Sequence, residues 1–185
     1  MRLSVVATAL VALIAARPAA GQDMFTVEAG VFGVATNFEN GQYGIHDRSG
    51  FGGRAAVYVW RNTALEAEYS YTKTPAGRFG DLKYTPLVIR ALHNTPLGEH
   101  VSFMIGAGYI RAAYDVGDLY DDGLQVTLGT RAGLPGSALL RANVFLDRFE
   151  SGYAFSSRND LVVNLGFQLG VSYAFGPFGG RAGAP

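Results

Sequence analysis

The strongest constraint on the fold is an alternation of large apolar residues with small or polar residues that runs through residues 161–175. A period of two places every second side chain on the same face of a β-strand. One face of this segment is therefore apolar, whereas the other carries mainly small or polar residues, among them Asn164, Gln168 and Ser172. The pattern predicts a β-strand with one apolar face.

The same alternation returns seven times earlier in the chain, which makes eight predicted strands. The connections alternate between short ones, at 61–63, 93–100 and 135–137, and longer ones. An even strand number with tight turns at one end and loops at the other predicts an all-β, eight-stranded antiparallel up-and-down transmembrane barrel. In the fourth strand Pro86 predicts a bulge. The predicted strands are residues 24–34, 51–60, 64–73, 82–92, 101–112, 124–134, 138–149 and 160–175.

Composition excludes several other classes of protein. The 15 basic and 15 acidic residues cancel, so no overall positive charge attracts a nucleic acid. The chain has no cysteine, which excludes a disulfide-stapled fold and a cysteine-ligated zinc site. With 185 residues and 49% hydrophobic content, it has the length and composition of one folded domain.

Residues 1–21 have the composition of a secretory signal peptide. Arg2 precedes an apolar run, and Ala19 and Gly21 supply the small residues of a cleavage site, so we expect cleavage after Gly21. The alternative is an uncleaved anchor, but the run is short for a helical span. The predicted organisation is a signal peptide at 1–21, an outer-membrane barrel at 22–175 and a short periplasmic tail at 176–185.

The charges on the polar faces indicate which side of the barrel meets lipid. In a membrane, an inside-out barrel would place four arginines in hydrocarbon, at a cost of roughly 2–4 kcal/mol each near the midplane. We therefore expect the apolar faces to meet lipid and the small residues to fill a narrow interior. A soluble lipocalin-like binder, with its apolar faces inside, remains the alternative.

The inward charges are balanced, and we expect them to form an ion-pair network that plugs the lumen, because a lone buried charge is costly. The counter-hypothesis is a charged conduction pathway. The predicted network consists of Glu28, Arg54, Glu66, Glu68, Arg90, Arg131, Arg141 and Asp147.

Two segments carry a resemblance to a known family. The final strand, GFQLGVSYAF at residues 166–175, and the Gly-rich stretch MIGAGYIR at 104–111 resemble the small outer-membrane barrels typified by the N-terminal domain of outer-membrane protein A. The resemblance implies that Tyr173 and Phe175 belong to a C-terminal signal read by the barrel-assembly machinery. It also implies an outer-membrane location with lipid as the surrounding partner, and we expect a monomer.

Four basic residues are predicted to face outward at the extracellular rim: Lys73, Lys83, Arg111 and Arg148. They could bind lipopolysaccharide phosphates, because a charged tip on an apolar stem suits an interface. Pairing with acidic residues of the loops is the equally weighted alternative. We also expect aromatic girdles at the strand ends. The expected girdle residues are Trp60, Tyr69, Tyr71, Tyr109, Tyr114, Phe149, Tyr173 and Phe175.

No motif predicts catalysis, a metal or a cofactor. The acidic loop with Asp115, Asp118, Asp121 and Asp122 lacks the spacing of an EF-hand loop, which favours a solvated loop. His93 and His100 flank a predicted turn, and His46 lies in a loop. The sequence predicts a structural, envelope-integrity or surface-interaction role, with contacts through 37–49 and the loops near Asp118 and Tyr153. The alternatives are a narrow transport or ion pore and, less favoured, a lipid-modifying barrel enzyme.

Overall fold

The computed structural model describes residues 25–38, 48–75, 80–98, 100–115, 119–150 and 161–176. Each of the eight predicted segments forms a strand. The predicted signal peptide, and the tail beyond Gly176, lie outside the described residues. The strands are β1 Val27–Asn37, β2 Arg48–Trp60, β3 Thr63–Pro75, β4 Asp81–Pro96, β5 Val101–Tyr114, β6 Tyr120–Gly133, β7 Ala138–Glu150 and β8 Leu161–Phe175.

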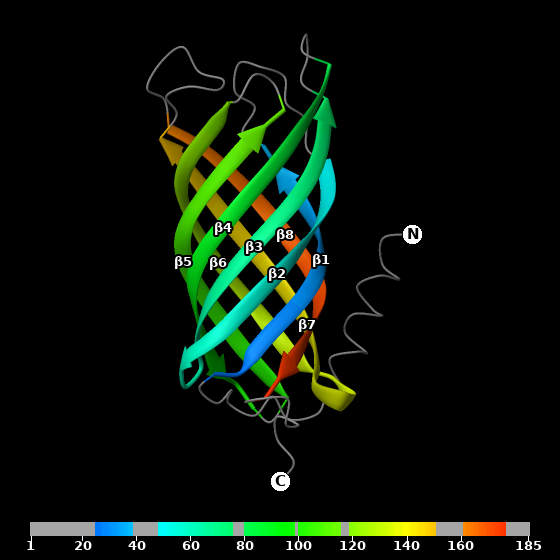
Figure 1. Ribbon diagram of the computed structural model, residues 1–185, viewed down its shortest axis with the longest axis vertical. Coiled ribbons are helices and arrows are strands. Elements are labelled where there is room, and N and C mark those ends of the chain that lie inside the picture. Colours follow the sequence, from blue (N-terminus) through cyan, green and yellow to red (C-terminus); the bar gives the residue numbers. More distant parts are fainter. Residues whose placement is uncertain are drawn as a thin grey trace.

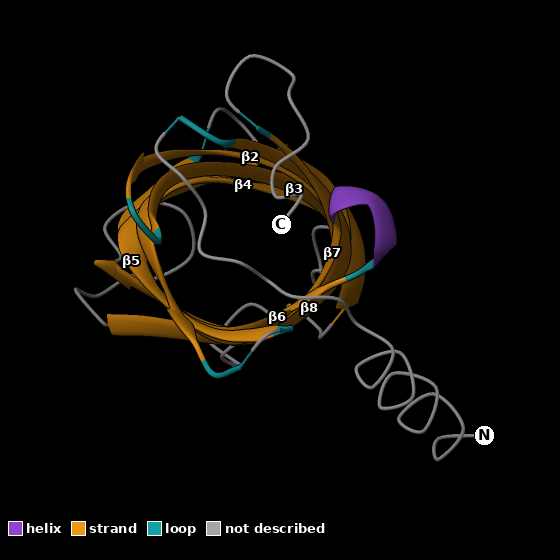
Figure 2. Cartoon of the chain, turned by 90° about the horizontal axis from the view of Figure 1, so that it is seen from below, coloured by secondary structure: helices purple, strands orange, loops and turns teal. Residues whose placement is uncertain are grey.

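The strands form one closed barrel in which each strand pairs with its neighbours in sequence. All pairings are antiparallel, and β8 closes the barrel against β1, from Val27 opposite Phe175 to Asn37 opposite Leu165. Figure 1 shows the strands tilted against the long axis, and Figure 2 shows the closed ring seen along it. The predicted up-and-down antiparallel barrel is confirmed.

Short turns join the strands at the end of the barrel where β1 begins and β8 ends. Residues 61–62 connect β2 to β3, and the 3-10 turn η2 Pro135–Ser137 leads into β7. The connections at the opposite end are longer, as the sequence predicts. Within the described ranges, no helix is long and apolar enough to cross a membrane.

Most strands extend beyond their predicted ends. For example, β2 begins at Arg48 and β3 ends at Pro75. Backbone hydrogen bonds between neighbouring strands continue beyond the apolar band. In that region apolar and polar residues no longer alternate, so the sequence pattern does not indicate a strand. The expected bulge at Pro86 is wrong, because β3 and β4 keep one register from Thr63 opposite His93 to Pro75 opposite Asp81. An irregularity lies instead in β2, between Tyr58 and Trp60.

Large apolar side chains are exposed on the outer face of the barrel. Such a continuous apolar surface is the band that outer-membrane barrels present to lipid. The predicted orientation of the faces therefore agrees with the structure. One exposed residue from each strand is Val31, Phe51, Leu65, Ile89, Ile105, Leu128, Val144 and Leu165.

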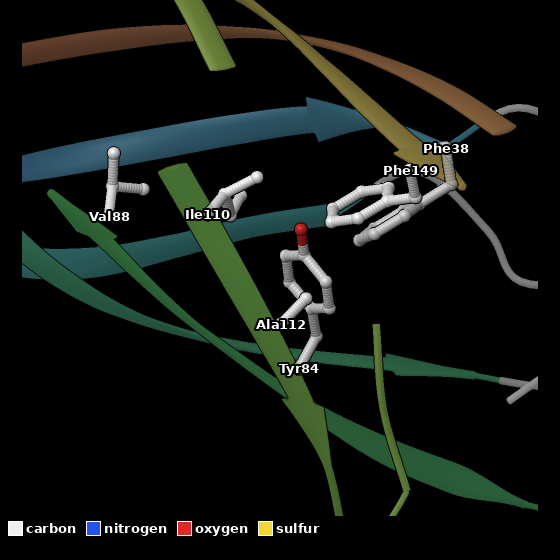
Figure 3. Close-up of a cluster of buried hydrophobic side chains, with 6 residues drawn as sticks. All are labelled: Phe38, Tyr84, Val88, Ile110, Ala112 and Phe149. Carbon is white, nitrogen blue, oxygen red and sulfur yellow. The ribbon is translucent and has the colours of Figure 1, made fainter. Parts of the chain in front are cut away.

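The interior is not uniformly polar, because a cluster of apolar residues fills it near the loop end. We call this cluster the aromatic cap. The rings of Phe38 and Tyr84 meet edge to face with centroids 5.1 Å apart, and Figure 3 shows Phe149 beside them. Tyr114 packs against the cluster from its edge. The aromatic cap consists of Phe38, Tyr84, Val88, Ile110, Ala112 and Phe149.

The aromatic cap corrects part of the predicted girdle. Phe149 is 1% exposed and points into the barrel, and Tyr114 packs inward as well. Both residues follow the inward parity of their strands, since Phe149 shares a face with Asp147 and Tyr114 shares a face with Ala112; residue type and position near a strand end had placed them in the girdle instead. Trp60 and Tyr69 are exposed on the outer face, as a girdle requires.

Candidate functional site

The candidate site is the set of eight charged residues that the sequence placed in the barrel interior. Strand parity turns all of them inward, and each is at most 5% exposed. Seven of these residues lie together in the half of the interior nearer the short turns, and we call this group the ionic tier. The ionic tier comprises Glu28, Arg54, Glu66, Glu68, Arg90, Arg131 and Arg141.

Arg90 bridges two glutamates of the neighbouring strand. Its Nη2 donates to Glu66 Oε1 at 2.6 Å and to Glu68 Oε2 at 2.8 Å, and its Nε donates to Glu66 Oε1 at 2.9 Å. Glu66 is the cross-strand partner of Arg90, and parity places Glu68 one position along the same face. Arg90 Nη1 also donates to Gln125 across the lumen. One guanidinium therefore connects β3, β4 and β6.

Arg141 and Arg131 hold the remaining glutamate from the other side of the barrel. Arg141 Nη1 donates to Glu66 Oε2 at 2.5 Å and to Glu28 Oε1 at 3.2 Å. Arg131 Nη1 donates to Glu28 Oε2 at 3.3 Å and to the Tyr58 hydroxyl. These contacts join β1, β2, β3, β6 and β7 across the lumen. Buried charges held this way are paired and hydrogen-bonded, which offsets their desolvation.

Neutral amides complete the contacts of the ionic tier. Gln168 donates to Glu68, and Asn143 Nδ2 donates to Gln168 Oε1 at 3.3 Å. Gln125 Nε2 donates to Asp147 Oδ1 at 2.8 Å. Sequence reasoning selected only charged residues and missed these amides as members, although alternation already placed them on the inward faces.

Arg54 and Asp147 are inside the barrel but outside the ion pairs. Within the described residues, Arg54 forms no hydrogen bond through any guanidinium nitrogen; the guanidinium lies over the Phe32 ring at 4.6 Å. Asp147 accepts its hydrogen bond from the Gln125 amide. The expectation that all eight charges pair with one another is therefore met by three arginines and three glutamates only.

The predicted rim residues are exposed, and three of the four are in ion pairs. Lys73 Nζ lies 2.6 Å from Asp81 Oδ2, and Lys83 Nζ lies 3.3 Å from Asp115 Oδ2. Lys73 and Lys83 are direct cross-strand partners. Two like charges placed opposite each other repel, and the flanking carboxylates offset this repulsion.

The other two rim residues lie farther round the barrel. Arg111 Nε donates to Asp122 Oδ1 at 2.8 Å, and its guanidinium stacks 4.6 Å from the Tyr120 ring. Among the described residues, Arg148 forms no ion pair. The rim pairing with acidic residues, one of the two alternatives raised by the sequence, is thus present in the structure.

Asp115 shows how the acidic loop is held. The backbone N–H of Lys83 donates to Asp115 Oδ1 at 2.8 Å, and this contact holds the pKa of the carboxyl below its usual value. Tyr114 donates to Asp121 Oδ2 at 3.0 Å. Asp118 lies outside the described residues. In the parts of the chain that are described, no three His, Asp or Glu side chains are grouped as metal ligands.

The histidines differ in part from their predicted positions. Because β4 continues to Pro96, His93 lies within that strand and is exposed outward, and its Nδ1 is 2.9 Å from Thr63 Oγ1. His46 lies outside the described residues.

Comparison with solved structures identifies proteins of the same architecture. The outer membrane protein OprG from Pseudomonas aeruginosa matches with a TM-score of 0.60 and 14% identity, over 85% of this chain and 99% of its own. Neisserial surface protein A matches with a TM-score of 0.56 and 19% identity, over 82% and 97%. The chain has the fold of a small outer-membrane barrel.

A further structural match is Ail, the attachment invasion locus protein of Yersinia pestis. Its TM-score is 0.54 at 14% identity, over 83% of this chain and all of Ail. Ail has also been solved with the heparin analogue sucrose octasulfate. No protein-family model and no curated protein sequence matches this chain. The fold and the apolar exterior are those of proteins that span the outer membrane.

Proposed function

We propose that this protein is a non-conducting outer-membrane barrel with a structural, envelope-integrity or surface-interaction role. The observation that carries the proposal is an interior filled from both ends. The ionic tier lies in the half near the short turns, and the aromatic cap is packed in the half near the loops. The cap and the ionic tier lie in series, so an ion crossing the barrel would have to displace both.

The two halves resist opening for different reasons. Separating a guanidinium from its carboxylates in the ionic tier leaves buried charges without partners, which is strongly unfavourable. Hydrating the aromatic cap exposes large apolar side chains to water, at roughly 25 cal/mol per Å². Phe32, Val34 and Phe145 form a second apolar cluster in the interior. The filled lumen supports a plug over the alternative of a narrow pore.

Conductance tests this proposal directly. Purified protein inserted into planar lipid bilayers is expected to show no single-channel steps in potassium chloride. A quadruple variant, with Arg90→Ala and Glu68→Ala in the ionic tier and Phe38→Ala and Phe149→Ala in the aromatic cap, removes side chains from both barriers and serves as the opened comparison, with measurable ion flux expected. Regular conductance steps from the unmodified protein would contradict the plug.

We also propose that the rim contacts lipopolysaccharide through Lys73, Lys83, Arg111 and Arg148. Exposed ion pairs contribute only about 0–1 kcal/mol, so a phosphate can replace the aspartates at little cost. Arg148 has no competing ion pair among the described residues. The complex of Ail with a sulfated sugar supports the idea that a barrel of this fold can bind a polyanion.

The rim proposal predicts a specific loss of binding. Changing all four rim residues to glutamine is expected to weaken the binding of purified lipopolysaccharide to detergent-solubilised protein by about tenfold or more, equivalent to about 1.4 kcal/mol. Arg61→Gln is the matched control, because Arg61 is exposed in the turn at the opposite end. Equal affinities for the quadruple variant and the parent would reject the proposal.

We also propose two features of biogenesis. The signal peptide is cleaved after Gly21, and Tyr173 and Phe175 form the signal that the barrel-assembly machinery recognises. The two rings are exposed at the end of β8 with centroids 4.9 Å apart, so they form one aromatic surface. The two residues lie on β8, the strand that closes the barrel against β1. This position supports the proposal that the assembly machinery recognises them before the barrel closes.

A further inference from the structure

The wall formed by β2, β1 and β8 carries two buried hydrogen-bond donors that have no partner among the described residues. Arg54 is 5% exposed and Ser172 is 4% exposed. The three guanidinium nitrogens of Arg54 and the hydroxyl of Ser172 are all unsatisfied. Buried polar groups in proteins are almost always hydrogen-bonded, so an unpartnered group calls for a ligand or another explanation.

The two donors lie in one row across the wall. Gly30 on β1 is the direct partner of Arg54 on β2 and of Ser172 on β8. Ser172 Oγ occupies the space above Gly30, because a Cβ at that glycine would lie 2.3 Å from it. The hydroxyl therefore leans toward the strand that carries Arg54.

The guanidinium of Arg54 leans toward the same place from the other side. A Cβ on Gly170, one inward position from Ser172 on β8, would lie 2.8 Å from Arg54 Nη2. Both donors thus converge on a stretch of wall made of glycine, where backbone can be approached closely. Arg141, the cross-strand partner of Gly170, borders the same stretch, and its Nε is also unsatisfied within the described residues.

In the described part of the chain, Arg54 is the arginine of the ionic tier that has no carboxylate partner. The other three arginines are paired with Glu28, Glu66 and Glu68, and the eighth inward charge, Asp147, accepts a hydrogen bond from Gln125. Glu68 is the cross-strand partner of Arg54, but its carboxylate receives hydrogen bonds from Arg90 and Gln168. A buried charge without a counterion is costly.

We propose that Arg54 and Ser172 bind a small inorganic anion of halide type, with chloride as the natural occupant. A guanidinium and a hydroxyl are donors, and an anion accepts from both while neutralising the unpaired charge. A monatomic ion suits a packed interior better than an organic anion does. The site lies within the ionic tier, and the inference does not depend on whether the barrel conducts.

Thermal unfolding in detergent tests the site. At constant ionic strength, replacing sodium gluconate by sodium chloride or bromide is expected to raise the Tm of the parent, because a ligand that binds only the folded state stabilises it by RT ln(1 + L/Kd), where L is the free ligand concentration. Arg54→Met removes the unpaired charge, so this variant is expected to fold and to lose the halide dependence. A halide effect of the same size in Arg54→Met would overturn the proposal.

A bromide derivative locates the ion. Crystals of the full chain grown with sodium bromide are expected to show an anomalous peak in contact with Arg54 and Ser172. Ser172→Ala is expected to reduce both the peak and the Tm shift. The matched control is Thr127→Ala, which removes a buried hydroxyl that donates to Val144 O on another wall and should leave both unchanged. An absent peak in the parent, or an unchanged one in Ser172→Ala, would reject the site.

Discussion

Replacing Arg141 by methionine is expected to lower the free energy of unfolding by about 3–5 kcal/mol, because it removes one partner of a buried ion-pair network. Arg141 contacts Glu28 and Glu66 at once. Methionine keeps a long apolar stem in the packed interior, so the loss reflects the carboxylates rather than a large cavity. The measurement is equilibrium unfolding in denaturant, in detergent micelles, followed by β-sheet circular dichroism.

Arg148→Met is the control for the Arg141 variant. It makes the same chemical change on the same strand, β7, but Arg148 is exposed on the outward face at the rim, whereas Arg141 is buried in the interior. A surface substitution of this kind usually changes stability by less than about 0.5 kcal/mol. If both variants unfold at the same denaturant concentration as the parent, the ionic tier does not stabilise the barrel.

Placing arginine at Ile89 is expected to cost about 2–4 kcal/mol in a bilayer, because a charge on the lipid face near the midplane loses its hydration. Ile89 lies near the middle of β4 and is 54% exposed on the outer face. The effect should be measured by reversible unfolding of protein inserted in lipid vesicles. This experiment tests the orientation on which every other functional inference depends.

Ile89→Ala is the matched comparison for the arginine variant. It removes the same apolar side chain without adding a charge, so it separates the loss of lipid contact from the cost of burying an ion. A barrel in which the apolar face is shielded from acyl chains would tolerate arginine and alanine equally. That result would favour the soluble, lipocalin-like alternative over a membrane barrel.

Alternation predicted the strands and the direction of most side chains because period two is a local property of an extended backbone. Glu66 and Glu68 are two residues apart and point the same way in any strand. The same rule already placed Gln125 and Asn143 inside the barrel. Their contacts could not be predicted, because the contacts depend on which strands face each other across the lumen.

Two expectations failed for different reasons. Phe149 was expected in the outer girdle because aromatic residues near strand ends suit a membrane interface, although its parity with Arg141 and Asp147 on β7 turns it inward. Arg54 was expected to be paired because the total inward charge balances. Balance along the sequence does not fix pairing in space, and the glutamates near Arg54 are already held by Arg90, Arg131 and Arg141.

The sequence by itself determined eight strands, their polarity and the side of the sheet that meets lipid, since each follows from the spacing of side chains along one backbone. Closure of β8 against β1 and the register of all eight pairings were decided by the tertiary structure. Register sets which inward residues share a level of the lumen. For that reason only the folded barrel separates the paired arginines from Arg54 and brings Arg54 and Ser172 to one wall.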